Sequence, residues 1–442
     1  MCLKAIFKTL LVFLLMFGFY MKYLGLALLP LLAAMTTAQA ETAFDPQGQY
    51  LLGDWNGQRT KLAQQGIKFE ANLLTDTAYI ADGGRNEGAD PLTSAQLWLG
   101  TQLDMEKLAG WEGITIRAAM TARQGQSTSI HDLQDPNAPQ LANVQGTFGR
   151  GNQDSRLSEL SIEKNFKDQG LSIKAGRLGL GMDFNVMACD FASTAFCAAQ
   201  MGKWQGNIWM NTPVAQWGAQ VKQQVAPELM IQVGVYEFNP DNGNGAKEGQ
   251  GWSLDTDHAD GVTIPAEIVW TPKSLVNGLP GSYRIGGMYN TADEVANQKD
   301  IAHPADAKNR TFAGWLAVEQ QITSTGQGRQ GLHSFANFTW HDRDTNKVDN
   351  SQQLGVKYIG LADSQPNDIL GLAVNRVHVN HRFADSRPAL NADAEYNIEL
   401  NYSYNATKWL MLRPNLQYVV NPGSSNNVNN ALVLGLTSRL IF

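Results

Sequence analysis

The last twelve residues, ALVLGLTSRLIF at 431–442, place large apolar side chains at every second position. Leucines stand at 432, 434, 436 and 440, Ser438 is the one interruption, and the row ends on the aromatic ring of Phe442. Successive side chains of a strand point to opposite faces, so this period of two predicts a strand with one apolar face. Such a strand suits either the core of a soluble sandwich or a lipid-facing sheet, and the rest of the chain must decide between them.

The composition favours extended β-structure that faces two unlike solvents. Charged residues make up 17% of the 442 residues, below the roughly 25% of soluble domains. The mean hydropathy of −0.26 argues against a helical membrane protein. The chain has 42 glycines and 9% aromatic residues, a mixture that is typical of membrane strands and their turns. The net charge of −7 argues against a nucleic-acid partner, which would need basic patches.

Residues 1–40 have the pattern of a secretory signal peptide. They contain three lysines and no acid, and the run KYLGLALLPLLAAMTTAQA ends on small residues before Glu41. A membrane anchor is the alternative, and the Ala-Gln-Ala exit argues against it. Residues 1–20 form a second basic and apolar stretch, so Met1 and Met21 are both candidate starts. We expect an exported mature chain with a periplasmic segment at 41–66 and a barrel at 67–442.

Sixteen segments of the mature chain are predicted to be strands, and residues 54–66 are predicted to be one short periplasmic helix. Asp54 or Asn56 would cap that helix and Gly66 would end it. Alternation is clearest in IKFEANL, MIQVGV and YNIELNYSY. The predicted strands lie near 67–80, 93–104, 113–121, 156–166, 171–178, 214–222, 228–238, 262–270, 281–290, 311–322, 331–341, 352–360, 368–380, 395–404, 408–419 and 431–442.

Long and short connections alternate between these strands. The long gaps include 122–155, 179–213 and 239–261, and tight turns such as KDQG at 167–170 and NATK at 405–408 lie between other pairs. An outer-membrane barrel has this pattern, with short periplasmic turns and longer extracellular loops on an even number of strands. We therefore predict an all-β, antiparallel transmembrane barrel of about 16 strands. Its leucine row faces lipid, its last strand pairs with its first, and Phe442 lies at the periplasmic interface.

Several blocks of the chain resemble the carbohydrate-selective porin (OprB) family. They are GDWNGQRTKLAQQGI at 53–67, GRLGLGMDFNVMACDFASTAFC at 176–197, YRIGGMYN at 283–290, NDILGLAVNRV at 367–377 and LMLRPNLQYVVNPG at 410–423. The family usually has a glycine where this chain has Asn56. The resemblance implies a sixteen-stranded outer-membrane barrel in a Gram-negative bacterium that passes glucose and related sugars. It also implies that a C-terminal aromatic residue, here Phe442, serves as a signal to the outer-membrane assembly machinery.

A barrel of about 16 strands leaves an aqueous channel, so selectivity depends on side chains that face the lumen. Charges of both signs, amides and an aromatic ring suit a neutral polyhydroxyl solute, because amides and charged groups bind hydroxyls and the ring stacks on a sugar. For each residue the alternative is a solvated lumen residue with no specific role. Strand parity places Trp98, Arg117, Glu159, Glu163, Lys174, Arg413, Asn415 and Gln417 on the lumen face.

The long segment at 179–213 is predicted to fold into the lumen and form the constriction. Its middle, DFASTAFC, is too apolar for a freely solvated loop and should pack against the wall. Lys174 and Arg177 stand at its base, and Asp183, Phe184 and Asp190 lie within it. Opposed charges at a narrow point would order water without excluding neutral solutes. In an oxidising compartment, Cys189 and Cys197 are predicted to form a disulfide, and two free buried thiols are the alternative.

The sequence predicts a passive porin with no cofactor and no metal site. His378 and His381 have a spacing that a metal site uses, but no cysteine or carboxylate cluster completes it. Expected partners are small neutral sugars and outer-membrane lipid. A general porin, or a porin for polyols or organic acids, is the first alternative, and the acidic composition argues against acids. A barrel enzyme is the second, although no nucleophile with an orienting base is evident. A plugged receptor of ~22 strands would need a longer chain.

Overall fold

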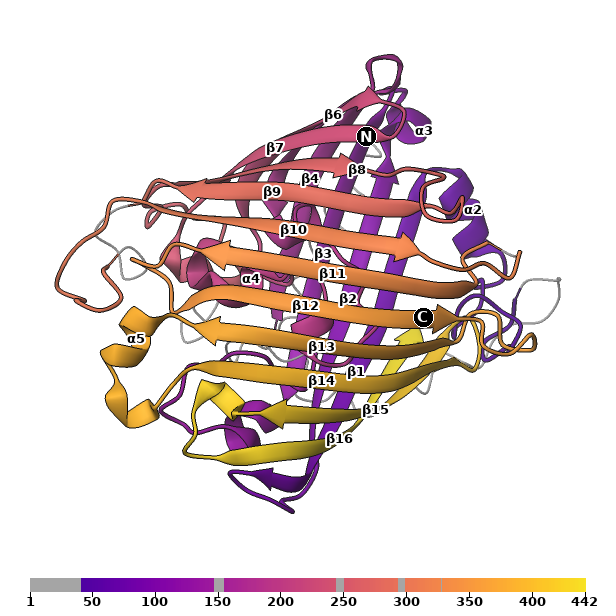
Figure 1. Ribbon diagram of the computed structural model, residues 1–442. Coiled ribbons are helices and arrows are strands. Elements are labelled where there is room, and N and C mark those ends of the chain that lie inside the picture. The colour runs from indigo at the N-terminus through magenta and orange to yellow at the C-terminus, as the bar shows by residue number, and fades with distance from the viewer. Residues whose placement is uncertain (1–40, 147–154, 244–249, 293–298, 327) are drawn as a thin grey trace.

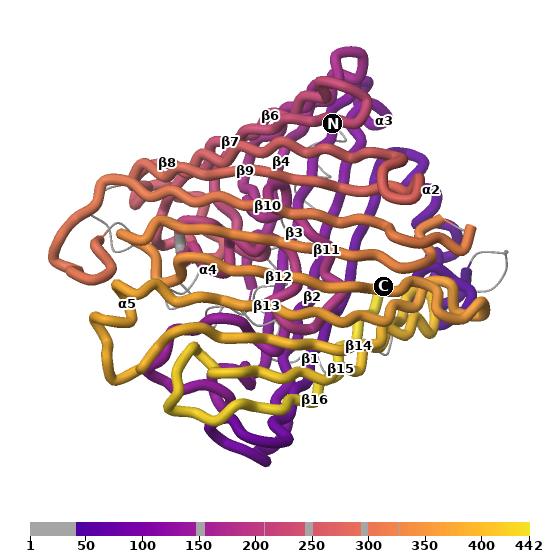
Figure 2. The backbone as a smooth tube through the Cα atoms, viewed as in Figure 1, coloured from indigo at the N-terminus to yellow at the C-terminus, as the bar shows by residue number. Residues whose placement is uncertain are grey.

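The computed structural model describes residues 41–146, 155–243, 250–292, 299–326 and 328–442. The predicted signal peptide at 1–40 lies outside the described residues. The chain forms one closed antiparallel barrel of sixteen strands in sequential order, in which β16 pairs with β1 (Figures 1 and 2). Within the described residues, no helix is long and apolar enough to cross a membrane. The predicted fold class, strand number and closure are confirmed.

The strand boundaries follow the predicted ones to within a few residues at each end. The strands are β1 (Ile67–Gly84), β2 (Leu92–Asp104), β3 (Ile114–Gly125), β4 (Ser155–Phe166), β5 (Leu171–Leu178), β6 (Gln216–Ala226), β7 (Leu229–Glu237), β8 (Val262–Trp270), β9 (Gly281–Asn290), β10 (Thr311–Gln321), β11 (Gly331–His341), β12 (Val348–Ile359), β13 (Ile369–Val379), β14 (Ala394–Asn405), β15 (Leu410–Val420) and β16 (Asn429–Ile441). The short helices are α2 (Gln58–Gln64), α3 (Met105–Ala109), α4 (Met201–Trp204) and α5 (His381–Asp385).

The leucine row of β16 points outward, as predicted. Leu434 and Leu436 are both 47% exposed, whereas Val433 and Thr437 on the opposite face are buried. Outward-facing aromatic side chains gather at both ends of the strands, where aromatic girdles mark the two membrane interfaces. Trp270 and Tyr404 lie at the end of the short turns. The outer girdle lies at the end of the long loops, which faces the cell exterior, and consists of Tyr289, Phe312, Trp340, Tyr396 and Tyr418.

The N-terminal helix is shorter than predicted, and residues 54–57 do not belong to it. Trp55, Asn56 and Gly57 all have positive φ (51°, 56° and 81°), so the chain turns in the left-handed region before α2 begins. Asp54 still acts at this end, because its Oδ1 accepts a hydrogen bond from the Thr60 N–H at 2.8 Å. Asparagine is one of the few residues other than glycine that adopt positive φ readily, so Asn56 fits this turn.

The segment before β1 is tied to the end of the chain. Arg59 is buried, with its guanidinium 3.7 Å from the ring centroid of Tyr50 and 4.5 Å from that of Trp55. Its Nη2 donates to the backbone oxygen of Phe442 at 2.7 Å, and the Phe442 N–H donates to Ala71 O at 2.9 Å. The segment before β1 therefore holds the end of the closing strand in place.

Candidate functional site

The segment that joins β5 to β6, residues 179–215, folds into the barrel and is called the inner loop below. Figure 1 shows its helix α4 inside the ring of strands. Phe191 packs on Phe196 of the same loop (ring centroids 5.3 Å apart) and on Phe335 of β11 (5.5 Å). Phe184 meets Tyr236 of β7 edge-on at 6.2 Å. The apolar middle of the loop is thus packed against the wall, as its composition predicts.

Lysines of β5 and β6 hold the start of the inner loop through one carboxylate. Asp183 lies 2.7 Å from Lys222 Nζ and 3.4 Å from Lys174 Nζ, and Lys174 is also 3.4 Å from Glu159 of β4. Burial raises the pKa of Asp183, but the two lysines outweigh that effect and hold its pKa below the ordinary value. The loop therefore carries a fixed negative charge against this wall.

Further along, carboxylates of the wall accept hydrogen bonds from backbone N–H groups of the inner loop. Glu267 of β8 accepts from Asn185 N at 3.0 Å. Glu399 of β14 accepts from Ala192 N and Ser193 N, both at 2.8 Å. The side chains of Glu267 and Glu399 are buried beneath the loop. Charged acceptors form stronger hydrogen bonds than neutral ones, so these two residues fix the path of the loop across the lumen.

The two cysteines lie at the far turn of the inner loop. Cys189 and Cys197 are joined by a disulfide. Beside them, Asp190 lies 2.6 Å from Lys357 of β12, and Arg413 Nη2 of β15 donates to Cys189 O at 3.5 Å. Burial raises the pKa of Asp190, but Lys357 outweighs it and the net direction is downward. The loop is thus anchored to strands from β5 to β15.

A second loop meets the inner loop from the other side. In the described part of the segment between β3 and β4, Gln145 Nε2 donates to the backbone oxygens of Asp76 and Leu92 at 3.0 Å. The Thr194 N–H donates to Asn143 O at 2.8 Å, which links the two loops directly. The lumen is therefore narrowed by two segments that support one another.

Inward side chains of β1–β3 that lie toward the short-turn end stay accessible, whereas those toward the long loops, such as Asp76, Ser94 and Thr121, are buried. Lys68 and Glu70 are exposed, and Trp98 and Arg117 are half-buried. Trp98 pairs across β2 and β1 with Asn72, so it lies in the same inward row as the polar side chains around it. Solvent therefore reaches this side of the lumen, whereas the side that carries Glu267 and Glu399 is covered.

A cavity of about 180 Å³ lies next to the inner loop and is lined by basic side chains. Its lining includes Arg123 of β3 and Lys203 of α4, together with Asn143, Thr194 and Trp209. Burial and the neighbouring Arg123 lower the pKa of Lys203 to about 8. The overall negative charge of the chain did not predict this local excess of cations, because net charge says nothing about where charges lie.

Several predicted lumen residues position other groups and do not face open solvent. Arg177 is buried and lies 3.9 Å from Glu237 of β7, so its partner is not a carboxylate of the inner loop. Phe184 is 0% exposed and packs on Tyr236 within the barrel. Gln417 donates to Val144 O of the second loop at 2.9 Å, and Glu163 accepts from Ser172. Asn415, Arg413 and Glu159 are likewise at most 9% exposed.

The sequence reasoning missed three of the anchors that hold the inner loop. Glu267, Lys222 and Lys357 sit at inward positions of β8, β6 and β12. The sequence indicated only that each of these charged side chains faces the lumen. It did not indicate that a loop covers them, because the alternation along a strand predicts the face of a side chain and not its burial.

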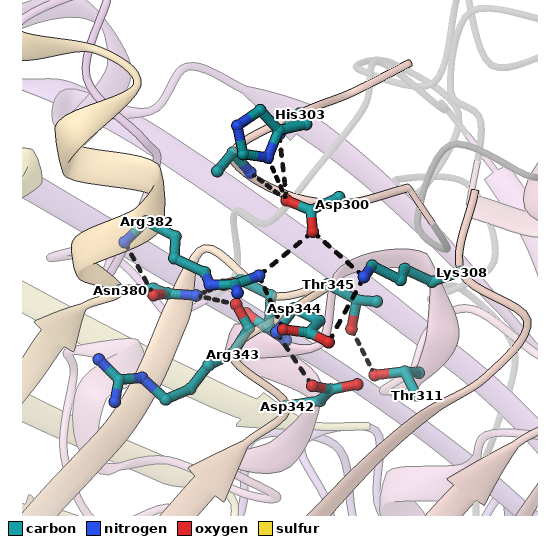
Figure 3. Close-up of polar contacts among 12 residues, drawn as sticks. Asp300, His303, Lys308, Thr311, Asp342, Arg343, Asp344, Thr345, Asn380 and Arg382 are labelled. Carbon is teal, nitrogen blue, oxygen red and sulfur yellow. Dashed lines mark hydrogen bonds and ion pairs between the residues drawn. The ribbon is translucent and has the colours of Figure 1, made fainter. Parts of the chain in front are cut away.

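The extracellular rim holds a separate polar cluster, shown in Figure 3. Asp300 lies 3.3 Å from Lys308 Nζ and 3.2 Å from Arg382 Nη1. Asp344 contacts the same two cations at 3.6 and 2.7 Å. Burial raises the pKa of Asp300, but the N–H groups of Ala302 and His303 and the two cations lower it to about 2. This rim cluster ties together the connections after β9, β11 and β13.

Comparison with known proteins identifies the family. The profile described as "Carbohydrate-selective porin, OprB family" matches residues 89–442. The chain belongs to the OprB family of carbohydrate-selective porins. It is 38% identical over 432 residues to Porin B of Pseudomonas aeruginosa, a match that covers 92% of this chain and 94% of Porin B. It is 37% identical over 439 residues to the putative porin QuiX of Acinetobacter baylyi, covering 95% and 99% of the two chains.

The solved structures agree with this assignment. The high-pH structure of Pseudomonas putida OprB matches with a TM-score of 0.85 at 38% identity and covers 91% of this chain and all of that one. The low-pH structure of the same protein matches with a TM-score of 0.59. The OprB-family chain described here is therefore an outer-membrane carbohydrate porin of a Gram-negative bacterium. In its described residues, no group of three or more His, Cys, Asp or Glu side chains is placed to hold a metal ion.

Proposed function

We propose that the porin conducts glucose and related monosaccharides by passive diffusion, through a passage between the inner loop and the inward face of β1–β3. The observation that carries the proposal is a contrast in exposure: Glu70, Trp98 and Arg117 remain accessible, whereas Glu267 and Glu399 on the opposite wall are buried beneath the anchored loop. These side chains offer hydroxyl-binding groups of both charges beside an aromatic ring. The family description, a carbohydrate-selective porin, supports the same substrate class.

A second candidate function is the passage of sugar acids. The observation that favours it is the cavity with Arg123 and Lys203 in its lining. Two cations near the entrance raise the local concentration of anions and favour a carboxylate over a neutral solute. Glu70, Trp98 and Arg117 would then bind the hydroxyl groups of the sugar acid.

Liposome swelling with the purified porin separates these functions. Glucose, arabinose, a disaccharide and gluconate are compared at equal osmolarity. The proposed function predicts fast swelling in glucose and arabinose and slow swelling in the disaccharide and gluconate. Gluconate entry faster than glucose would assign the pore to sugar acids. Equal rates for all four solutes would show a general diffusion pore and contradict the proposal.

A further inference from the structure

The lipid-facing side of β11–β13 carries a cation where an aromatic side chain stands on neighbouring strands. Arg376 pairs across the sheet with Gln352 of β12 and Tyr396 of β14. Its neighbours in sequence, Asn375 and Val377, are both 0% exposed and point inward, so Arg376 points outward. Tyr396 belongs to the outer girdle, which places this guanidinium at the level of the outer-leaflet headgroups.

Two amides hold the guanidinium of Arg376. Its Nη1 donates to Asn350 Oδ1 at 3.3 Å and to Gln352 Oε1 at 3.2 Å. A guanidinium has five N–H donors, and its planar fork matches a phosphate. The amides orient the group without neutralising it. In the described part of the chain, no carboxylate lies within ion-pair distance of Arg376.

The nearby carboxylate is engaged with other donors. Asp349 accepts from His378 Nδ1 at 2.6 Å and from Asn350 Nδ2 at 2.6 Å, and it lies 3.7 Å from Arg343 Nε. A further carboxylate, Asp393, lies 3.4 Å from His378 Nε2, so both nearby carboxylates have partners other than Arg376. Arg376 itself therefore keeps a guanidinium whose described partners are neutral amides, which suits an anion.

An apolar groove lies directly on the periplasmic side of this cation. Its volume is about 520 Å³, and the small side chains of Ser334 and Ala336 form part of its lining. Leu354, Val374 and Ile398 also line it, and they stand two residues along their strands from Gln352, Arg376 and Tyr396. Two residues of a strand span about 7 Å, so the groove begins one side chain below the cation.

We propose that this outer face of β11–β13 binds a phosphorylated, acylated glycolipid of the outer leaflet. Its phosphate contacts Arg376, and one acyl chain lies in the groove lined by Ser334 and Ala336. The charge complementarity selects this occupant over a second copy of the chain. An outward arginine near the interface costs little by itself, and here two amides orient it beside an apolar groove.

Native mass spectrometry of the folded porin in detergent tests the proposal. The probes are lipid A with its phosphates, the same lipid after phosphate removal, and phosphatidylglycerol. We expect one retained lipid A per barrel. We expect R376Q to weaken that binding about tenfold, because a charge-assisted contact is lost. We also expect A336W to abolish it by filling the groove.

Two matched variants act as controls, and heat-modifiable mobility on gels confirms that every variant is folded. R387Q removes a cation elsewhere on the extracellular rim, and A266W places the same bulk on the exposed outer face of β8. Both should bind lipid A like the original protein. Equal binding by R376Q, equal retention of the dephosphorylated lipid or of phosphatidylglycerol, or barrel dimers without lipid would each overturn the proposal.

Discussion

Trp98 is the residue whose role in the passage is simplest to test. Its indole is half-buried on the accessible side of the lumen, where a sugar ring could stack on it. Trp98→Ala should weaken glucose binding by ~0.5–1.5 kcal/mol, while Trp98→Phe should keep most of it. Glucose-dependent block of single-channel current in planar bilayers measures the affinity. Equal block in all three proteins would show that the ring contributes nothing.

Asp300 gives the extracellular rim a defined pH dependence. Its pKa of about 2 in the folded protein lies below the ~3.9 of an unfolded aspartate. The ionised group therefore stabilises the rim cluster above pH ~4, and this contribution is lost as the pH falls through the folded value. Hydrogen exchange of residues 299–310 should accelerate between pH 4 and pH 2. Asp300→Asn should show fast exchange throughout; acceleration at low pH in that variant would point to another group.

For single residues, the sequence predicted which face of a strand a side chain lies on better than whether that side chain is buried. Alternation placed Arg413 and Gln417 on the inward face, because a strand leaves only two directions. It could not show that these two are buried under loops, since that depends on contacts between segments more than 200 residues apart. Alternation also placed Trp98 and Glu163 on the inward face. It could not show that Trp98 remains accessible or that Glu163 accepts a hydrogen bond from Ser172.

Among the elements, the N-terminal segment has a role that its length does not suggest. Arg59 of α2 connects this segment to Phe442 and to two aromatic rings. Arg59→Ala should lower the free energy of unfolding by ~1–3 kcal/mol, from the lost hydrogen bond and ring contacts. The midpoint of heat-modified mobility reports this loss. Lys61→Ala, an exposed change on the same helix, should leave the midpoint unchanged, and an equal shift in both variants would contradict the account.

The sixteen strands were predictable because each is a local pattern bounded by turn residues. Helix α2 was predicted too long, because Trp55 and Asn56 take left-handed backbone conformations that composition does not reveal. The inward course of the inner loop followed from its apolar middle. Its anchors at Glu267 and Lys357 could not be predicted, because a single charged residue in a strand does not indicate which distant residue it contacts.

For the whole molecule, the barrel supplies a rigid frame and the inner loop supplies the restriction. Wall charges from β5 to β15 hold the loop, and the second loop supports it through a hydrogen bond from the Thr194 N–H to Asn143 O. If the loop sets selectivity, removing it should leave a folded but unselective pore. The structure offers a clean excision, because the Met201 N–H donates to Asn185 Oδ1 at 3.1 Å and so brings these two positions together.

The most direct test of this account is the ratio of glucose to gluconate entry in liposomes, measured for the intact porin and for a variant in which a two-glycine linker replaces residues 186–200. The intact porin should admit glucose several times faster than gluconate, a ratio that needs only ~1 kcal/mol of discrimination. The shortened variant should swell faster in both solutes, with a ratio near that of free diffusion. An unchanged ratio in the folded variant would contradict the claim that the inner loop selects the solute.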